Sequence, residues 1–181
     1  MNDFIDLFTS NIKRPGSIDL LDWLTVKTDF LAAPASSKYH SCHEGGLAEH
    51  SVNVFDRLRI SYEYNSETVA ICGLLHDICK ANFYTVSTRN VKNEQTGQWE
   101  KKPYYSVEEK FPFGHGEKSV FLIIQYMKLT MEEAVAIRFH MGYTGDYTND
   151  KACGAAFRKY PLALELHIAD MRASYLDEKE E

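Results

Sequence analysis

The sequence has few cysteines and no long apolar run, and both shortages narrow the class of protein. Four cysteines occur among 181 residues, and no two of them form a C-x-x-C pair. A chain of this length does not need disulfides, so we expect reduced and mostly buried thiols. No apolar run reaches about 18 residues, the length at which a membrane-spanning helix becomes a candidate. Residues 1–10 lack the cationic and apolar regions of a signal peptide. We therefore expect a soluble, cytoplasmic protein with no membrane partner.

The chain also lacks a surplus of positive charge. It carries 20 Lys and Arg against 26 Asp and Glu, a formal net charge of −6. Proteins dedicated to nucleic acids usually carry a basic surplus for phosphate contacts, so the composition argues against a dedicated nucleic-acid-binding surface. A small phosphorylated partner needs only a local cation cluster or a metal. With 44% hydrophobic and 25% charged residues and no internal repeat, residues 1–181 are expected to form one globular domain.

Most of the sequence has the periodicity of helices, which predicts an all-α fold. The expected helices span residues 17–31, 47–62, 66–80, 117–128, 130–141 and 161–176. Thr130 and Glu133 have the spacing of a capping box, and Pro161 stands at a favoured first helical position. Residues 143–150 (YTGDYTND) are expected to form a loop.

One stretch departs from the helical pattern. Residues 83–91 (FYTVSTRNV) and 98–107 (QWEKKPYYSV) are rich in β-branched and aromatic residues, and turn-forming residues separate them. This predicts a peripheral β-hairpin inserted at about residues 83–107. The connection between the flanking helices far exceeds the usual ~4–6 residues, and long connections tend to be functional. One hypothesis is that the hairpin covers a site as a lid. The alternative is that its aromatics pack on the core or form a dimer contact.

The segment 69–79 (VAICGLLHDIC) is apolar on every side, which is typical of a buried helix. Its only polar side chains are those of His76 and Asp77. A buried carboxylate is costly unless a partner compensates its charge. A metal ion is one such partner, because it binds imidazole and carboxylate together. The alternatives are a His–Asp hydrogen bond and a pairing of Asp77 with a distant arginine.

Four further motifs, together with the one that contains His76 and Asp77, extend over most of the chain. They are HEGGLAEH (43–50), LLHDICK (74–80), GHGE (114–117), RFHMG (138–142) and LHIADM (166–171). Their order resembles the HD-domain superfamily of metal-dependent phosphohydrolases. The likeness is greatest to the HD domain of certain bacterial 3′-to-5′ exoribonucleases, whose pattern has glycine where this chain has Cys79. Nothing resembles the OB domain of those enzymes. The resemblance implies an HD-domain helical bundle with a core at about residues 43–176.

The resemblance also implies a ligand set. The four core metal ligands it implies are His50, His76, Asp77 and Asp170. Family members that hold two ions have two further histidines, and these match His115 and His140. Such a set allows Asp77 to bridge two divalent ions, each with open positions for water and substrate. The donor types suit Fe, Mn, Ni and Zn, and the metal, Mg included, stays open.

Three further residues are candidates for contact with a substrate. Lys80 follows His76 by four residues, so on a continuous helix its ammonium would share that face and meet a bound phosphate. The alternative is a solvated surface lysine. The resemblance places His43 at the mouth of the pocket, and Tyr143 is a candidate for stacking on a base. His40, in a polar loop, is expected to be solvated, whereas His167 either orients Asp170 or packs in the core.

The leading hypothesis is a metal-dependent phosphohydrolase that cleaves a phosphomonoester or phosphodiester of nucleotide origin, such as a nucleotide or short oligonucleotide. Two ions would activate a shared water, with Asp77 as the bridge and Lys80 as the cation that neutralises the phosphate. The ligand set equally resembles HD-type di-iron oxygenases similar to myo-inositol oxygenase. A third reading is a non-catalytic module that senses nucleotides.

Overall fold

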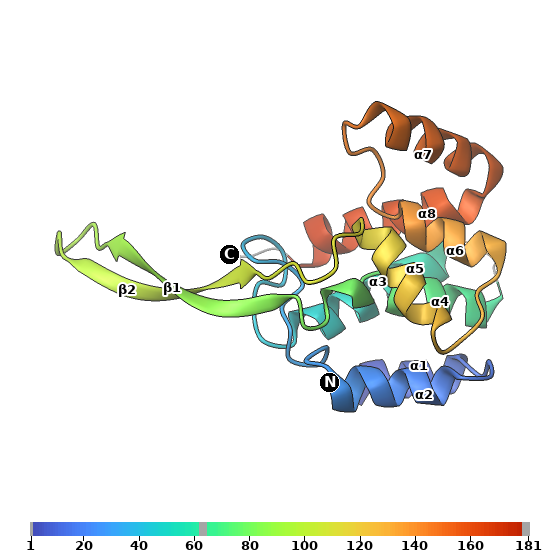
Figure 1. Cartoon of the computed structure of the whole chain (residues 1–181), viewed down its shortest axis with the longest axis horizontal. Helices are drawn as coiled ribbons and strands as arrows, with labels where there is room; N and C mark the ends of the chain where they lie inside the picture. The colour runs from blue at the N-terminus through green and yellow to red at the C-terminus, as the bar shows by residue number, and fades with distance from the viewer. Residues whose placement is uncertain (1, 62–64, 179–181) are drawn as a thin grey trace.

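The computed structural model describes residues 2–61 and 65–178, and helices form the body of the molecule (Figure 1). The helices in these residues are α1 (Asn2–Asn11), α2 (Ser17–Asp22), α3 (Gly46–Ser61), α4 (Ser66–Leu75), α5 (His115–Ile124), α6 (Met131–Phe139), α7 (Tyr147–Lys159) and α8 (Pro161–Arg172). Short π-helical turns follow α2 (Trp23–Lys27) and α8 (Ala173–Asp177), and a 3₁₀ turn follows α4 (Ile78–Lys80). The prediction of an all-α fold is confirmed.

Helix α4 lies at the centre of the core. Every residue from Val69 to Leu75 is buried, which confirms the prediction for this apolar segment. Helices α3 and α6 pack against α4 and α8, α1 and α2 cover one side of the body, and α7 covers the other (Figure 1). Because the two helices on either side of α4 also contact α8, polar side chains from four elements can reach one buried point.

Two glycines allow the close helix contacts on which this arrangement depends. A Cβ atom at Gly73 on α4 would lie 2.6 Å from the Cα of Phe55 on α3. A Cβ atom at Gly116 on α5 would lie 2.2 Å from the carbonyl oxygen of Arg138 on α6. Both distances are shorter than a carbon atom tolerates, so only glycine permits these approaches. The two contacts hold α3 close to α4 and α5 close to α6.

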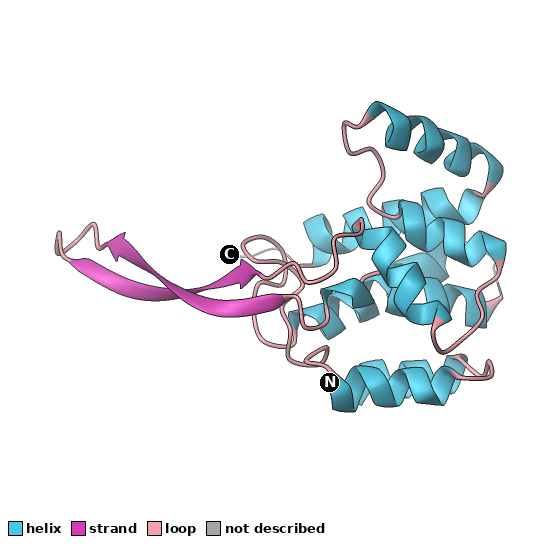
Figure 2. Ribbon diagram, viewed as in Figure 1, coloured by secondary structure: helices cyan, strands magenta, loops and turns pink. Residues whose placement is uncertain are grey.

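The predicted β-hairpin is confirmed. Strands β1 (Tyr84–Lys92) and β2 (Trp99–Val107) pair antiparallel, with Tyr84 opposite Val107 and Lys92 opposite Trp99. Figure 2 shows the two strands projecting away from the helices. At the base, the Tyr84 hydroxyl donates a hydrogen bond of 3.4 Å to the carbonyl of Ala35. In this structure the strands extend outward instead of lying over the helical body, so the lid hypothesis gains no support from their position.

Several predicted boundaries are wrong. The helix predicted at 17–31 ends before Thr28, whose backbone is extended. The hydroxyls of Thr25 and Thr28 donate hydrogen bonds to the carbonyls of Leu21 and Leu24. Such side-chain bonds compete with the backbone bonds of a helix and weaken it. The helix predicted at 117–128 begins two residues earlier, at His115. Helix α1 was not predicted. The predicted end of the 47–62 helix lies outside the described residues.

The largest error concerns residues 143–150, which were predicted as a loop. Helix α7 begins inside this stretch, at Tyr147, and Asp146 caps it by accepting a hydrogen bond of 2.8 Å from the backbone N–H of Asn149. An Asp side chain at this position satisfies a free N–H of the first helical turn. The predicted capping box of Thr130 and Glu133 is present at the start of α6.

No helix among the described residues is both long enough and apolar enough to cross a bilayer. Cys72, Cys79 and Cys153 are buried thiols, as expected, and Cys42 is half-buried.

Candidate metal centre

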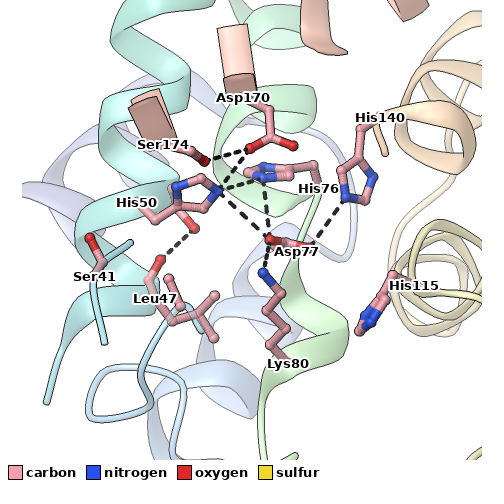
Figure 3. A network of polar contacts seen from close by, with 12 residues as sticks. Ser41, Leu47, His50, His76, Asp77, Lys80, His115, His140, Asp170 and Ser174 are labelled. Carbon is pink, nitrogen blue, oxygen red and sulfur yellow. Dashed lines mark hydrogen bonds and ion pairs between the residues drawn. The ribbon is translucent and has the colours of Figure 1, made fainter. Parts of the chain in front are cut away.

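Three histidines and two aspartates meet at a buried point between α3, α4, α6 and α8 (Figure 3). Three overlapping sets of three residues each have donor atoms within 4.8 Å of one another. Two meet at this point, one of His50, His76 and Asp77 and one of His76, His140 and Asp170, and the third joins His50 to His40 and Glu178. The side chains of the three histidines are fully buried, and the side chain of Asp77 is 2% exposed. The structure therefore brings together five of the six ligands that the sequence analysis names.

His76 and His140 hold equivalent places at the ends of two helices. His76 directly follows α4, and its Nδ1 donates a hydrogen bond of 2.9 Å to the carbonyl of Gly73. His140 directly follows α6, and its Nδ1 donates a bond of 2.7 Å to the carbonyl of Ile137. A carbonyl oxygen only accepts, so Nδ1 carries a proton in both rings, and Nε2 is the nitrogen that faces the cluster. The prediction of one helix over residues 66–80 is wrong, because α4 ends at Leu75. The His76 side chain, instead of a later backbone N–H, bonds to the carbonyl of Gly73.

The Nε2 atoms of the three rings converge on one another and on carboxylate oxygens. His50 Nε2 lies 3.2 Å from His76 Nε2 and 3.3 Å from Asp170 Oδ1. His140 Nε2 lies 3.3 Å from Asp77 Oδ1, is buried, and has no hydrogen-bond partner in the described part of the chain. Nitrogen and oxygen acceptors gathered this closely repel unless a positive charge, a proton or a metal ion, lies between them. The cluster is therefore suited to a cation.

The pKa values respond to this excess of acceptors. Burial opposes protonation of His50, but hydrogen bonds with Asp170 and Glu178 outweigh it and raise the pKa of His50 to about 9. Burial lowers the pKa of His76 to about 4. Burial would raise the pKa of both Asp77 and Asp170. The neighbouring charges of Lys80 and His76 instead hold the pKa of Asp77 well below its usual range, and the hydrogen bond from His50 does the same for Asp170. Both carboxyls are thus ionised and attract positive charge.

The two oxygens of Asp77 face different neighbours. Oδ2 lies 3.6 Å from His76 Nε2 and 3.7 Å from His50 Nε2, whereas Oδ1 faces His140. A carboxylate with one oxygen toward each of two donor sets has the orientation of a bridging ligand. Neutral imidazole and ionised carboxylate are the donors that Zn, Fe, Mn and Ni accept in proteins, so the residues present fit a divalent metal.

Lys80 contributes the one ammonium in contact with Asp77 among the described residues. Its Nζ lies 2.7 Å from Asp77 Oδ2, and its side chain is 10% exposed. Burial would lower the pKa of Lys80, but the attraction of Asp77 outweighs it and raises the pKa above its ordinary value. The prediction that a continuous helix from His76 carries Lys80 to the site is wrong, because Lys80 lies on the 3₁₀ turn after α4. The chain reaches the same place through the turn, and the alternative of a solvated surface lysine is wrong.

His115, the first residue of α5, is half-buried and stands apart from the other five. Its Nδ1 lies 3.5 Å from the thiol sulfur of Cys79, and burial lowers its pKa. The sulfur lies 4.0 Å from Asp77 Oδ1, and burial raises the pKa of the thiol to about 12. His115 therefore adjoins the side of the cluster that Asp77 Oδ1 and His140 form.

A cavity of about 330 Å³ opens onto the cluster. Its lining comprises Tyr39, His40, Asp77, Lys80, Met141, His167, Asp170, Met171, Ser174 and Tyr175. His43 and Tyr143, two expected substrate contacts, lie elsewhere: His43 is exposed and 3.5 Å from Glu49, and the ring of Tyr143 packs edge-on against Phe157. The carboxylates of Asp77 and Asp170 and the ammonium of Lys80 are the acidic and basic groups of this lining, beside its two histidines.

Two histidines of this cavity differ from expectation. His40 was expected to be solvated, but it is half-buried, its Nε2 is closed off from solvent, and its ring centroid lies 5.0 Å from that of His50. His167 donates a 2.7 Å hydrogen bond from Nδ1 to the backbone carbonyl of His140 instead of orienting Asp170. It supports the cluster through the helix end that carries His140.

Glu178 is a site residue that the sequence analysis missed. Its carboxylate accepts hydrogen bonds from His50 Nδ1 (3.0 Å), the Ser41 hydroxyl (2.9 Å) and the Asn53 amide (3.0 Å). Burial would raise the pKa of Glu178, but the bond from His50 outweighs this and lowers it. The ionised carboxylate keeps the proton on Nδ1 of His50 and directs Nε2 to the cluster, as carboxylates behind metal-bound histidines do.

Fold and site together define a helical domain built around a buried set of histidine and aspartate donors. The sequence model of the HD domain matches residues 47–171, well over half of the chain, so the chain belongs to the HD domain family. The HD domain family consists of metal-dependent, hydrolase-type proteins, and its members bind divalent metals. Comparison with curated proteins and with solved structures found no match.

Proposed function

We propose that this chain is a phosphohydrolase that cleaves a phosphomonoester or phosphodiester of a small, nucleotide-derived substrate at two divalent ions. The observation that carries the proposal is the orientation of Asp77, whose Oδ2 faces His50 and His76 while Oδ1 faces His140. In the proposed centre, His50, His76, Asp77 and Asp170 hold the first ion. Asp77, His115 and His140 hold the second.

The ions, when bound, lower the pKa of a shared water and neutralise charge on the phosphoryl oxygens. The residues of the chain supply the rest. Glu178, Gly73 and Ile137 fix the ring orientation of the three histidines through their Nδ1 bonds. Lys80 keeps its proton and lies in the cavity lining, where it binds an anionic oxygen of the substrate.

The size of the cavity supports a small substrate. A volume of about 330 Å³ lies at the lower end of ligand pockets, roughly 300–1,000 Å³. Exposed side chains of Tyr39 and Tyr175 stand in its lining, with exposed fractions of 69% and 66%. Such rings offer a surface for a planar base, while the charged groups hold the phosphate end.

The position of Lys80 favours a phosphohydrolase over a di-iron oxygenase. A buried ammonium beside the bridging carboxylate strengthens binding of an anion, and oxygen carries no charge. A di-iron oxygenase and a nucleotide sensor remain outcomes that the experiment below distinguishes.

The first experiment measures metal content by elemental analysis and then phosphate or nucleotide release from phosphomonoesters, cyclic nucleotides and short oligonucleotides. Asp77→Asn is expected to bind fewer than two ions per chain and to lose turnover. Lys80→Gln is expected to keep both ions and to lose about 10²–10³-fold in kcat, the usual effect of removing one charge-stabilising donor. Lys110→Gln is the matched control, because Lys110 pairs with Glu108 at the surface, outside the cavity lining.

Three results would contradict the proposal. Turnover retained in Asp77→Asn removes the bridging role. Oxygen consumption coupled to an iron-loaded centre, without hydrolysis of any phosphoester, supports the oxygenase. Tight binding of nucleotides without turnover in the metal-loaded protein supports the sensor.

A further inference from the structure

The thiol of Cys79 lies beside the second proposed ion position, and no role described above uses it. Cys79 is 3% exposed and stands on the 3₁₀ turn two residues after Asp77. Its backbone N–H donates a hydrogen bond of 3.2 Å to the Ser119 hydroxyl on α5, which ties the turn to the helix that begins at His115. The side chain is thus fixed between Asp77 and His115.

The separations around the sulfur fit a shared metal ion. A metal–sulfur bond is about 2.3 Å and metal–nitrogen or metal–oxygen bonds are about 2.0–2.2 Å, so two donors on one ion lie no more than about 4.5 Å apart. The sulfur lies 3.5 Å from His115 Nδ1 and 4.0 Å from Asp77 Oδ1. Both separations fall within that limit.

A second observation points to a ligand at the same place. His140 Nε2 is fully buried, has no hydrogen-bond partner among the described residues, and lies 3.3 Å from the same Asp77 Oδ1. Its Nδ1 is already occupied by the carbonyl of Ile137, so Nε2 is the ring nitrogen that faces the Oδ1 side of the cluster. That side therefore has His140 Nε2 and the sulfur of Cys79 near Asp77 Oδ1, and His115 Nδ1 lies next to the sulfur.

We propose that Cys79 is a thiolate ligand of the second ion, which it binds together with Asp77, His115 and His140. The inference rests on the proposed two-ion centre and adds a donor to it. When the ion binds, the S–H bond of Cys79 breaks, a metal–sulfur bond forms, and the proton passes to water. The first position has nitrogen and oxygen donors only, so the two positions differ in chemical softness.

The difference in donors has a consequence for metal preference. A thiolate selects Zn, Fe or Co over Mg and Mn, which prefer oxygen donors. The second position is thus expected to reject Mg²⁺ even at concentrations that occupy sites built from carboxylates. The alternative, in which the thiol only donates a hydrogen bond to His115, predicts no such selection.

The test is a titration of metal-free protein with Co²⁺, followed by absorption spectroscopy. Bound Co²⁺ gives visible d–d bands with any ligand, and it gives a near-ultraviolet charge-transfer band only with thiolate. Wild type is expected to bind two Co²⁺ and to show a charge-transfer band for one thiolate per chain. Cys79→Ser is expected to lose this band while the first Co²⁺ still binds. Cys153→Ser, which changes a buried cysteine on α7, is the matched control and is expected to keep the band.

A second variant keeps the test decisive if Cys79→Ser does not fold. A chain with Cys42, Cys72 and Cys153 all replaced by alanine leaves Cys79 as its only cysteine, and it must still show the band. Two bound Co²⁺ without a charge-transfer band in wild type would overturn the thiolate ligand and leave the proposed function standing. Failure of the folded wild type to bind Co²⁺, Zn²⁺ or Mn²⁺ at all would overturn both.

Discussion

The cluster around Arg14 and the metal centre, both buried and charged, differ in how fully their groups are paired. In one, Arg14 makes two bonds to Glu133, of 2.6 and 2.9 Å, and the same carboxylate accepts from the Thr68 hydroxyl and the Thr130 backbone N–H. Every bond there joins a donor to an acceptor. In the metal centre, acceptor atoms outnumber the donors, as where two Nε2 atoms lie 3.2 Å apart and can share only one proton or cation.

The comparison shows how a structural polar cluster and a functional one can be told apart by pairing alone. A fully paired buried network stabilises the native fold without any further partner. A network with surplus acceptors is unfavourable unless an outside cation completes it. Residues of the first cluster should therefore affect stability, and residues of the second should affect metal binding.

The largest effect on stability is expected from Arg14→Met. The variant leaves the fully buried carboxylate of Glu133 without its cation, which costs about 3–5 kcal/mol of unfolding free energy. Urea denaturation of the metal-free protein measures this. Asp22→Asn is a control whose surface carboxyl takes no part in the cluster, and an equal loss there would contradict the assignment.

The same pair makes stability depend on pH in a defined direction. The bond to Arg14 overcomes burial and lowers the pKa of Glu133 from its ordinary value of 4.5. A lowered folded-state pKa means that the contribution is complete above pH 4.5 and is lost as the pH falls below it. This loss should be smaller in Arg14→Met, because that variant no longer stabilises the ionised form.

Metal addition is expected to stabilise the protein by an amount that does not depend on the Arg14 cluster. Binding to the folded state alone contributes about 4 kcal/mol when free metal is about 1,000 times its Kd. Wild type and Arg14→Met share the same metal centre, so both should gain this amount, and a chelator should reverse it. Thermal denaturation with and without Zn²⁺ measures the gain. A gain confined to wild type would mean that the two clusters are coupled.

A smaller effect is expected from Glu178→Gln. The variant weakens the charge-assisted bond to His50 and should reduce affinity for the first ion by about 10- to 100-fold, the usual effect of changing a carboxylate behind a metal-bound histidine. Metal competition with a chromophoric chelator measures the affinity. Asp177→Asn is the matched control, since this neighbouring acid pairs with Arg57. Equal affinities in wild type and Glu178→Gln would show that Glu178 only anchors the turn.

The sequence singles out His76 and Asp77 because their segment combines burial with charge, whereas His50, His115, His140 and Asp170 come from the resemblance to the HD-domain superfamily. His76 and Asp77 stand out as the only polar side chains of an apolar segment, and the structure buries both. Glu178 gives no such signal, since it lies among acids at 177–181 and becomes buried only through the turn after α8. Its role depends on a contact with His50, 128 residues earlier in the chain.

The errors in the predicted fold have local physical causes. Residues 147–150 contain tyrosine, threonine and asparagine, which form helices poorly, so the cap at Asp146 and the packing of α7 on α8 decide the structure there. The prediction of a continuous helix through Asp77 is wrong because the His76 side chain bonds to the carbonyl of Gly73 where α4 ends. That bond is a property of the site, and no periodicity of apolar residues records it.

The ends of α4 and α6 add an electrostatic contribution that the side chains alone do not account for. Each helix stops at a histidine of the cluster, so the C-terminal pole of each peptide macrodipole, about half a negative charge, lies next to the convergence point. Each pole favours a nearby cation by about 0.3–1 kcal/mol, and by up to about 2 kcal/mol in a partly buried place. The backbone therefore attracts positive charge independently of protonation, and some of this attraction should persist when a single histidine is replaced.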